Sequence, residues 1–170
     1  IPRTSEGKPT LLWVRRMDGT EAAPLTGTDG AQNPFWSADS RSVAFLSNRQ
    51  LKRIDLSGGP PQIIWTDPTG DTAAITASGA WNKDDTILFN ARQTSGAGYV
   101  LYRVAANGGT PTPATTLDES RAEIAHYWPR FLTDGRHCIY LAQSAKPENQ
   151  AIMLGSLDSK QAHQVLTSEF

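Results

Sequence analysis

The sequence predicts an all-β protein made of repeated four-stranded antiparallel units, and three observations support this prediction. First, short apolar runs alternate with stretches rich in Gly, Pro, Ser and Thr, a pattern typical of strands joined by turns. Second, one motif of aromatic residues and aspartate occurs three times along the chain. Third, a Gly-rich companion motif alternates with it. Two motifs alternating at a near-constant spacing indicate a repeat architecture.

In the first motif, an aspartate follows an aromatic residue by three positions, and a short apolar strand then ends in a second aromatic residue. Successive copies start 45 and then 50 residues apart. The copies are Trp36, Asp39 and Phe45; Trp81, Asp84 and Phe89; and Phe131, Asp134 and Tyr140. A turn aspartate accepts hydrogen bonds from nearby backbone N–H groups, so we expect these carboxylates to brace turns.

The companion motif is an apolar strand followed by a Gly-rich turn and a proline. Leu51–Pro61 matches Leu101–Pro111 without a gap, Leu12–Gly19 is an earlier copy, and Ile152–Asp158 is a weaker last copy. Asn-Gly and Asp-Gly pairs tolerate positive φ and predict hairpins. The prolines start the outermost strands, which agrees with a sheet edge that needs no N–H there.

Four short strands every 45–50 residues form the pattern of a β-propeller blade. We therefore expect one partial β-propeller domain over residues 1–170, with about three and a half blades. The half blade is expected at residues 1–27, and the full blades at 28–66, 67–117 and 118–167. Such a count does not close a ring, because propellers use about four to eight blades.

Both ends of the sequence read as cuts through a longer parent sequence, because no start or finish pattern marks them. The open faces at the two ends would then be covered by the remainder of the parent chain, by a second copy of this chain, or by rearrangement. Two copies hold about seven blades' worth of strands, which is a permitted ring size.

Charge and hydropathy exclude two classes of partner. The net charge is −1 and the pI is near 6.3, so no basic excess exists to bind a phosphate backbone, and we expect no nucleic-acid partner. No apolar run reaches the roughly 18 residues of a membrane span, so we expect no membrane insertion. A single cysteine, Cys138, excludes an internal disulfide.

The sequence contains no catalytic constellation, so we expect no enzyme activity, no catalytic residue and no cofactor. No Gly-x-Ser-x-Gly elbow or P-loop is present. His126, His137 and His163 are not spaced to share a metal on one element, so we expect no metal site. Cys138 lies in an apolar run and is interpreted as a small buried side chain.

Candidate binding residues come from the loops that enter the innermost strands or join second to third strands. These loops surround the mouth of the channel of a propeller. We expect Arg92, Arg121, Glu123 and His126 to face a protein or peptide partner. For His126, a hydrogen-bonded packing role is the favoured alternative.

The motif residues resemble the WD-repeat-like bacterial propellers of the TolB type. Phe131–His137 is near the family form, whereas Ala38 and Ser40 depart from it at turn positions. The stretch His126–Phe131, with the turn after it, especially resembles propellers attached to bacterial Ser/Thr protein kinases and winged-helix regulators. The resemblance covers residues 11–167.

The resemblance implies a non-catalytic binding module that is a fragment of a bacterial sensor or envelope protein. The count of about three and a half blades adds the expectation that it self-assembles to complete a ring. It implies a periplasmic or other extracytoplasmic location for the parent protein. The alternative is the gating propeller of a prolyl-oligopeptidase-like hydrolase, whose catalytic domain lies outside this sequence. One fold hosts all these roles, so the fold alone does not choose among them.

Overall fold

The computed structural model describes residues 10–69, 75–93 and 96–167. Within these residues the chain is all-β apart from two short 3-10 helices, η1 (Glu119–Arg121) and η2 (Pro147–Asn149). The predicted all-β class is therefore confirmed.

The strands fall into four consecutive sets, which we name the first to fourth units. The first unit contains β1 (Trp13–Arg15) and β2 (Ala22–Pro24). The second contains β3 (Gln32–Trp36), β4 (Ser42–Ser47), β5 (Gln50–Asp55) and β6 (Gln62–Thr66). The third contains β7 (Ile75–Trp81), β8 (Thr86–Arg92), β9 (Tyr99–Ala105) and β10 (Thr112–Pro113). The fourth contains β11 (Glu123–Phe131), β12 (His137–Ser144), β13 (Ala151–Ser156) and β14 (Ser159–Thr167).

Within each unit, strands that follow one another in sequence pair antiparallel. The third and fourth units are also joined, because Ala125 of β11 makes a parallel bridge to Tyr99 of β9. This bridge merges them into one eight-stranded sheet, whereas the sequence predicts separate four-stranded units. The cause is local: one end of β9 reaches the inner strand of the next unit.

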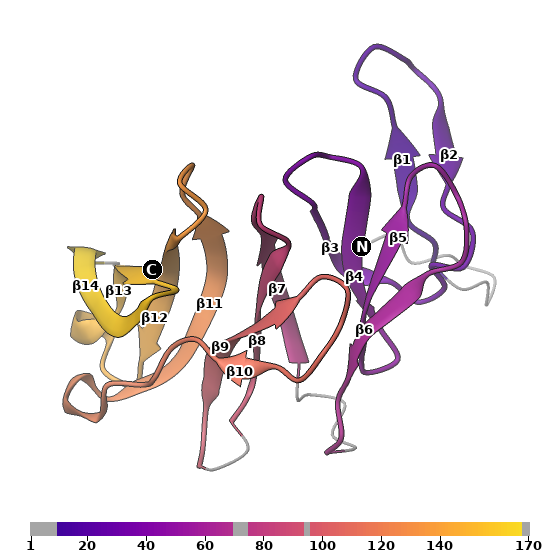
Figure 1. The fold of residues 1–170 in the computed structure, drawn as a ribbon. Coiled ribbons are helices and arrows are strands. Elements are labelled where there is room, and N and C mark those ends of the chain that lie inside the picture. Colours follow the sequence, from indigo (N-terminus) through magenta and orange to yellow (C-terminus); the bar gives the residue numbers. More distant parts are fainter. Residues whose placement is uncertain (1–9, 70–74, 94–95, 168–170) are drawn as a thin grey trace.

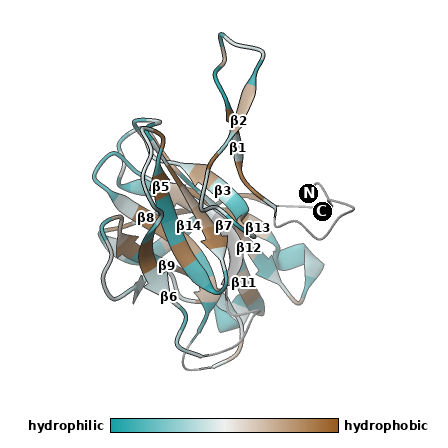
Figure 2. Ribbon diagram, turned by 90° about the vertical axis from the view of Figure 1, so that its right-hand side faces the viewer, coloured by the Kyte–Doolittle hydropathy of each residue, from teal (hydrophilic) through white to brown (hydrophobic). Residues whose placement is uncertain are grey.

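The units stand side by side in chain order, from β1–β2 at one end to β14 at the other (Figure 1). Strands β3, β7 and β11 begin the second, third and fourth units, and β7 contacts both of the others. The array of described strands is open, and its sheets do not close on themselves. Hydrophobic segments lie along the packed strands, and the peripheral loops are mostly hydrophilic (Figure 2).

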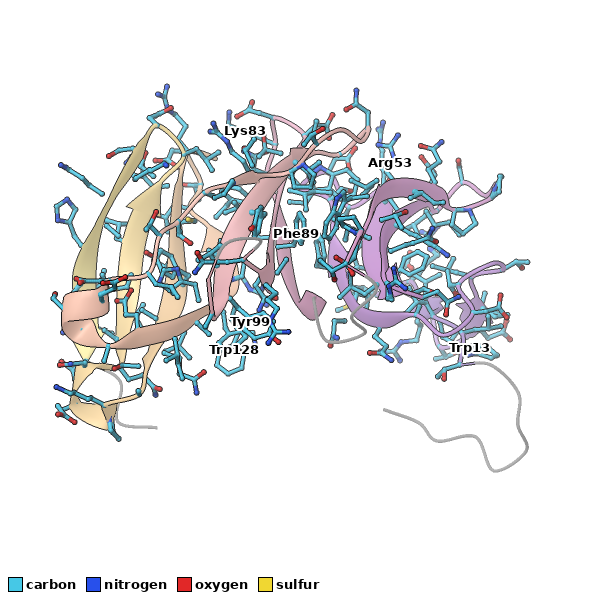
Figure 3. The ribbon with its side chains drawn as sticks, turned by 90° about the horizontal axis from the view of Figure 1, so that it is seen from below. Trp13, Arg53, Lys83, Phe89, Tyr99 and Trp128 are labelled. Atoms are coloured by element: carbon cyan, nitrogen blue, oxygen red, sulfur yellow. The ribbon has the colours of Figure 1, made fainter. Side chains whose placement is uncertain are left out.

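The core consists of three clusters, each formed where successive units meet. Phe45 of β4 belongs to the cluster that contacts the first unit, and its chain neighbour Ala44 belongs to the cluster shared with the third. Figure 3 shows Phe89 between the second and third units; its ring centroid lies 5.3 Å from that of Trp65. Burying a side chain of this size contributes about 1.5–3 kcal/mol. Apolar residues on both faces of one strand therefore stabilise two interfaces.

Two of the three repeated aspartates brace their turns as expected. The Asp39 carboxylate accepts from the Arg41 N–H at 3.0 Å, and Asp134 accepts from the N–H groups of Arg136 and His137 at 2.9 and 3.0 Å. These bonds and the His137 ring hold the pKa of Asp134 well below its usual range, with the bond from the His137 ring the strongest cause. The Asp134 carboxylate is therefore ionised at neutral pH.

The third aspartate, Asp84, differs from this prediction. The amide oxygen of the buried Asn82 accepts from the N–H groups of Asp84 and Thr86 at 3.0 and 2.8 Å. Asp84 itself forms a surface ion pair with Lys83 at 3.2 Å. This turn is one residue shorter than the one around Asp39, so an amide two positions earlier replaces the carboxylate.

Replacing Gly79 by alanine is expected to destabilise the protein by about 1–3 kcal/mol, because the added carbon overpacks the core. A Cβ on Gly79 of β7 would lie 2.2 Å from Cε1 of Phe35 of β3, so one of the two inner strands must shift. Urea unfolding monitored by circular dichroism measures the loss. Gly19→Ala is the matched control, since its Cβ would meet its nearest atom at 3.9 Å. Equal midpoints for the two variants would contradict this packing.

Candidate functional site

The four predicted binding residues separate into two places. Arg121, Glu123 and His126 come together where η1 enters β11. Arg92 ends β8 in the third unit and lines a pocket that none of the other three residues lines. The first location is a buried polar network, and the second is a partly exposed aromatic surface.

The first location is a buried polar network centred on Glu123. One carboxylate oxygen, Oε2, lies 3.1 Å from Nε2 of His126 and accepts from the Asp118 N–H at 2.8 Å. The other, Oε1, lies 3.3 Å from Nε of Arg121. The second nitrogen of His126, Nδ1, lies 2.8 Å from the Thr115 hydroxyl oxygen.

This network fixes the tautomer of His126. The ionised Glu123 carboxylate can only accept, so His126 Nε2 carries the hydrogen of the bond between them. In the neutral ring Nδ1 then accepts from the Thr115 hydroxyl, whose oxygen also accepts from the Leu101 N–H at 3.0 Å. Burial raises the pKa of Glu123, but the His126 bond, the Asp118 N–H and the charge of Arg121 outweigh burial and lower it overall.

The contacts give the network a structural role. His126 is only 1% exposed, and its ring centroid lies 4.8 Å from that of Tyr140. Arg121 donates to the Asn149 carbonyl at 2.6 Å, which ties η1 to η2. The network thus connects the segment leaving the third unit with the strands of the fourth. The Glu123 and His126 side chains do not reach an open surface, which matches the packing alternative for His126.

We expect Glu123→Ala to destabilise the protein by about 3 kcal/mol, because it leaves His126 and Arg121 without their buried partner. Glu119→Ala, an exposed change on the same short helix, is the control and is expected to stay within about 0.5 kcal/mol. Thermal unfolding measures both.

The pH dependence gives a second readout. Because the folded-state pKa of Glu123 is lowered, its stabilisation is fully present above the unfolded pKa of about 4.3 and is lost as pH falls below it. Glu123→Ala should lack this part of the acid-induced loss. A variant with the stability and acid sensitivity of the wild type would contradict the network.

The second location is an aromatic surface beside Arg92, which we name the aromatic rim: Tyr99, Tyr127 and Trp128. Tyr99 lies directly opposite Arg92 in the β8–β9 pairing. The Tyr99 and Tyr127 ring centroids are 6.4 Å apart, and those of Tyr127 and Trp128 are 6.1 Å apart. Figure 3 shows Tyr99 and Trp128 near one another on the same side of the molecule.

Trp128 has an unusual backbone. Its φ is +53°, in the left-handed region, and it lies at a register break between β11 and β12. The same break occurs in β3 at Asn33, with φ +50°; both residues precede a proline and stand three positions before the motif aromatic. Asparagine tolerates this conformation, whereas for a bulky residue it costs about 1–2 kcal/mol. Nevertheless, Trp128 is 63% exposed, so core packing does not account for it.

A pocket of about 180 Å³ lies between β6 and the third unit, and Arg92 is part of its wall. Its other walls are mainly aromatic and proline side chains, with Asp67 buried beneath a turn. They include Trp65, Tyr102, Pro68 and Pro111. Asp67 accepts from the Thr69 hydroxyl at 2.8 Å and lies 3.7 Å from Arg49 Nε, so its carboxylate already has partners.

The sequence does not predict the aromatic rim as a site, although it contains one signal for it. Trp128 occupies the position before proline where the second unit has Asn33, and a bulky residue at a turn-prone position is an anomaly. Tyr99 and Tyr127 carried no such signal, because only the folded structure brings β9 and β11 together.

Other sequence candidates show no reactive arrangement. Cys138 is buried, and burial raises the pKa of its thiol to about 11, so the nucleophilic thiolate is scarce at neutral pH. Among the described residues, no group of three His, Cys, Asp or Glu side chains could hold a metal ion. In the same residues, no helix has the length and apolar character needed to cross a membrane. The run Asp67–Asp71 carries two carboxylates that could hold a calcium ion, although its sequence favours a plain turn, and its last two residues lie outside the described residues.

No protein-family model and no curated protein matches the chain. Solved structures do. A prolyl endopeptidase aligns at 12% identity with a TM-score of 0.63, covering 96% of this chain and 27% of that one. The AtxE2 isopeptidase aligns at 9% identity with a TM-score of 0.54, covering 78% and 28%. TolB from Acinetobacter baumannii aligns at 13% identity with a TM-score of 0.43, covering 93% and 49%.

These likenesses concern the fold alone, because the identities are far below 25%. The aligned part of the prolyl endopeptidase is its propeller domain, so this chain has a β-propeller type of fold. The chain spans about a quarter of that enzyme's length. The predicted number of blades, the partial ring and the attachment to kinases or regulators stay predictions.

Proposed function

We propose that this chain is a non-catalytic propeller module that binds a protein or peptide partner at the aromatic rim. The observation that carries the proposal is Trp128, a large aromatic side chain held 63% exposed by a strained backbone. Strain of this kind persists where the surrounding structure enforces it and is concentrated at functional sites.

The chemistry of the rim favours a peptide-like ligand. Trp, Tyr and Arg are enriched among the residues that dominate protein interfaces, because they offer a large rigid apolar area together with polar groups. Tyr99, Tyr127 and Trp128 provide the aromatic area, and Arg92 adds a positive charge opposite Tyr99. The neighbouring pocket of about 180 Å³ has room for one apolar side chain. The expected ligand is an extended segment with an aromatic or proline residue near a carboxylate.

The proposed module has no catalytic activity of its own. The side chains of Glu123 and His126 are buried and hydrogen-bonded to one another, and the Cys138 thiol has a raised pKa. Neither arrangement offers an activated nucleophile to a substrate. We further propose an extracytoplasmic location for the parent protein, following the resemblance to TolB-type propellers.

A second candidate function is the gating propeller of a prolyl-oligopeptidase-like hydrolase. The likeness to the endopeptidase propeller, over 96% of this chain, favours it. In that case the catalytic groups would belong to another part of the parent protein, and the aromatic rim would contact that part or a passing peptide.

Trp128→Asn is expected to weaken peptide binding at least about tenfold while leaving stability unchanged or slightly raised, since asparagine adopts the left-handed backbone with less strain. Peptides selected from a displayed random library are the probes, and calorimetry measures their affinity. Arg92→Gln should weaken the peptides that carry a carboxylate.

Trp13→Asn is the matched control for this experiment. Trp13 is also 63% exposed, but it lies in the first unit, away from the aromatic rim. Its replacement should leave peptide affinity unchanged. Equal binding by Trp128→Asn and the wild type would refute the aromatic rim as the site.

Fluorogenic peptide substrates separate binding from catalysis. The purified chain is expected to release no more fluorophore than buffer does at neutral pH. Turnover that follows the protein through purification would overturn the non-catalytic assignment. A nucleophile elbow elsewhere in the parent reading frame would favour the gating role, whereas a kinase or winged-helix domain would favour a sensor.

A further inference from the structure

The pocket between the second and third units is much larger than the cavity at the next interface. It measures about 180 Å³, and we name it the inter-unit pocket. Trp65 in its wall stands opposite Leu51, and Ala114 takes the same place in the third unit, since its N–H bonds the Leu101 carbonyl at 2.7 Å. The cavity that Ala114 lines has about 10 Å³. Close packing leaves few voids larger than a water molecule, so the inter-unit pocket departs from the rule.

Two segments that are far apart in the chain form the outer walls of this pocket. Strand β6 and the turn after it provide Trp65 and Pro68, and the loop before β10 provides Pro111. The two segments lie close together, because a Cβ on Gly108 of that loop would lie 3.4 Å from the Ile64 carbonyl oxygen (Figure 1). The pocket therefore exists only where the second and third units meet.

The two aromatic walls, Trp65 and Tyr102, are held in place by the core. The ring centroid of the buried Phe89 lies 5.3 Å from that of Trp65 and 6.1 Å from that of Tyr102. One core ring thus supports both walls from inside the interface. Rings that are already ordered lose little conformational freedom when a ligand covers them, which favours binding.

Hydrogen-bond donors in these walls lack partners. Tyr102 is only 8% exposed, yet its hydroxyl has no hydrogen-bond partner among the described residues. The indole N–H of Trp65 is likewise unpaired within that part of the chain. Neither atom belongs to the fully buried unpaired atoms found there, so each reaches open space, and the inter-unit pocket is an open space that both side chains border. Polar groups in such surroundings normally have a partner, so both donors are available to a ligand.

The carboxylate in the wall, Asp67, is already engaged. Its Oδ1 accepts from the Thr69 N–H at 3.2 Å, and its Oδ2 accepts from the Thr69 hydroxyl at 2.8 Å. Arg49 Nε lies 3.7 Å from Oδ2, and Arg92 also lines the pocket, so the surrounding positive charge disfavours an ammonium ligand. A sugar ring fits poorly as well, because its hydroxyl groups need acceptors in addition to donors. The pocket suits an apolar group that accepts hydrogen bonds and donates none.

We infer that the inter-unit pocket binds a proline of an extended peptide, and that backbone carbonyls beside this proline accept from Tyr102 and Trp65. Proline has no N–H to leave unpaired, and a polyproline II segment docks on aromatic walls with its conformation already fixed. An engineered apolar cavity of about 150 Å³ holds a benzene molecule, so about 180 Å³ holds a pyrrolidine ring. The inference rests on the proposed function for the peptide class of the ligand, and it selects proline over an aromatic residue as the group in the pocket.

Calorimetry on the full chain tests the inference. The probe is a capped peptide of about nine residues with the repeat Ala-Pro-Pro, roughly three turns of polyproline II, titrated to about 1 mM. It should bind at least about tenfold more tightly than the same peptide with glutamine in place of every proline. Tyr102→Phe and Trp65→Phe each keep an aromatic ring and remove one hydrogen-bonding group. Each should weaken binding of the proline peptide about three- to tenfold, the effect of one neutral hydrogen bond.

Tyr140→Phe is the matched control for these variants. Tyr140 is 3% exposed and lines the cavity of about 10 Å³ at the next interface, which has no room for a proline ring. Removing its hydroxyl should leave the affinity for the proline peptide unchanged. Circular dichroism melting shows whether each variant is folded. If Trp65→Phe does not fold, Tyr102→Phe decides the test, because it keeps nearly all of the side-chain volume.

The outcomes separate this inference from the proposed function. Peptides from the displayed library that require Trp128, but bind folded Tyr102→Phe as they bind the wild type, would overturn the pocket and leave the aromatic rim standing. Peptides that require Tyr102 and not Trp128 would support the pocket and refute the rim. No binding of the proline peptide at about 1 mM, or equal affinity for its glutamine version, would overturn the choice of proline. Binding of maltotriose in its place, weakened by Tyr102→Phe, would identify a sugar site.

Discussion

The packing of one sheet face onto the next is the constraint on which this structure depends. Each central strand carries apolar residues on both sides, as Ala44 and Phe45 show, so a unit left alone would expose a face to water. Neighbouring units cover each other's apolar faces, so the free energy of unfolding comes largely from the interfaces between units. Gly79 shows how tight the approach is, because Phe35 of the preceding unit already fills the space where a side chain would be.

Buried polar groups also contribute to the interfaces between units, in addition to apolar packing. The Glu123–His126 network is buried where the chain passes from the third unit to the fourth. The Glu123 carboxylate accepts hydrogen bonds there, and the His126 ring is hydrogen-bonded to Thr115. A buried carboxylate needs such partners: the Asp118 N–H and His126 Nε2 both lie on Oε2 of Glu123, and Arg121 adds its positive charge 3.3 Å from Oε1. Its chemistry resembles that of a catalytic dyad, but its burial gives it a structural purpose.

The packing of the units offsets the unfavourable backbone conformation of Trp128 in the aromatic rim. A tryptophan in a left-handed conformation is unfavourable by itself, the more so before Pro129, since a residue that precedes proline favours extended backbone, and it coincides with the register break of β11. The second unit has the same register break and left-handed backbone at Asn33. The backbone conformation is therefore a feature of the repeat, whereas the tryptophan side chain occurs only in the fourth unit's copy of it. Function is therefore expected where the side chain departs from what the repeat prefers.

The sequence by itself determined the strand content and the periodic signature, because turn residues and alternating apolar runs act locally. It also predicted the turn bonds of Asp39 and Asp134, which involve neighbours in the chain. Tertiary structure decided what depends on distant segments: the parallel bridge of Ala125 to Tyr99, the burial of Glu123 and His126, and the meeting of Tyr99 with Tyr127. Local propensity carries no information about which strands become neighbours, so sequence reasoning identified the charged residues of the loops but not their surroundings.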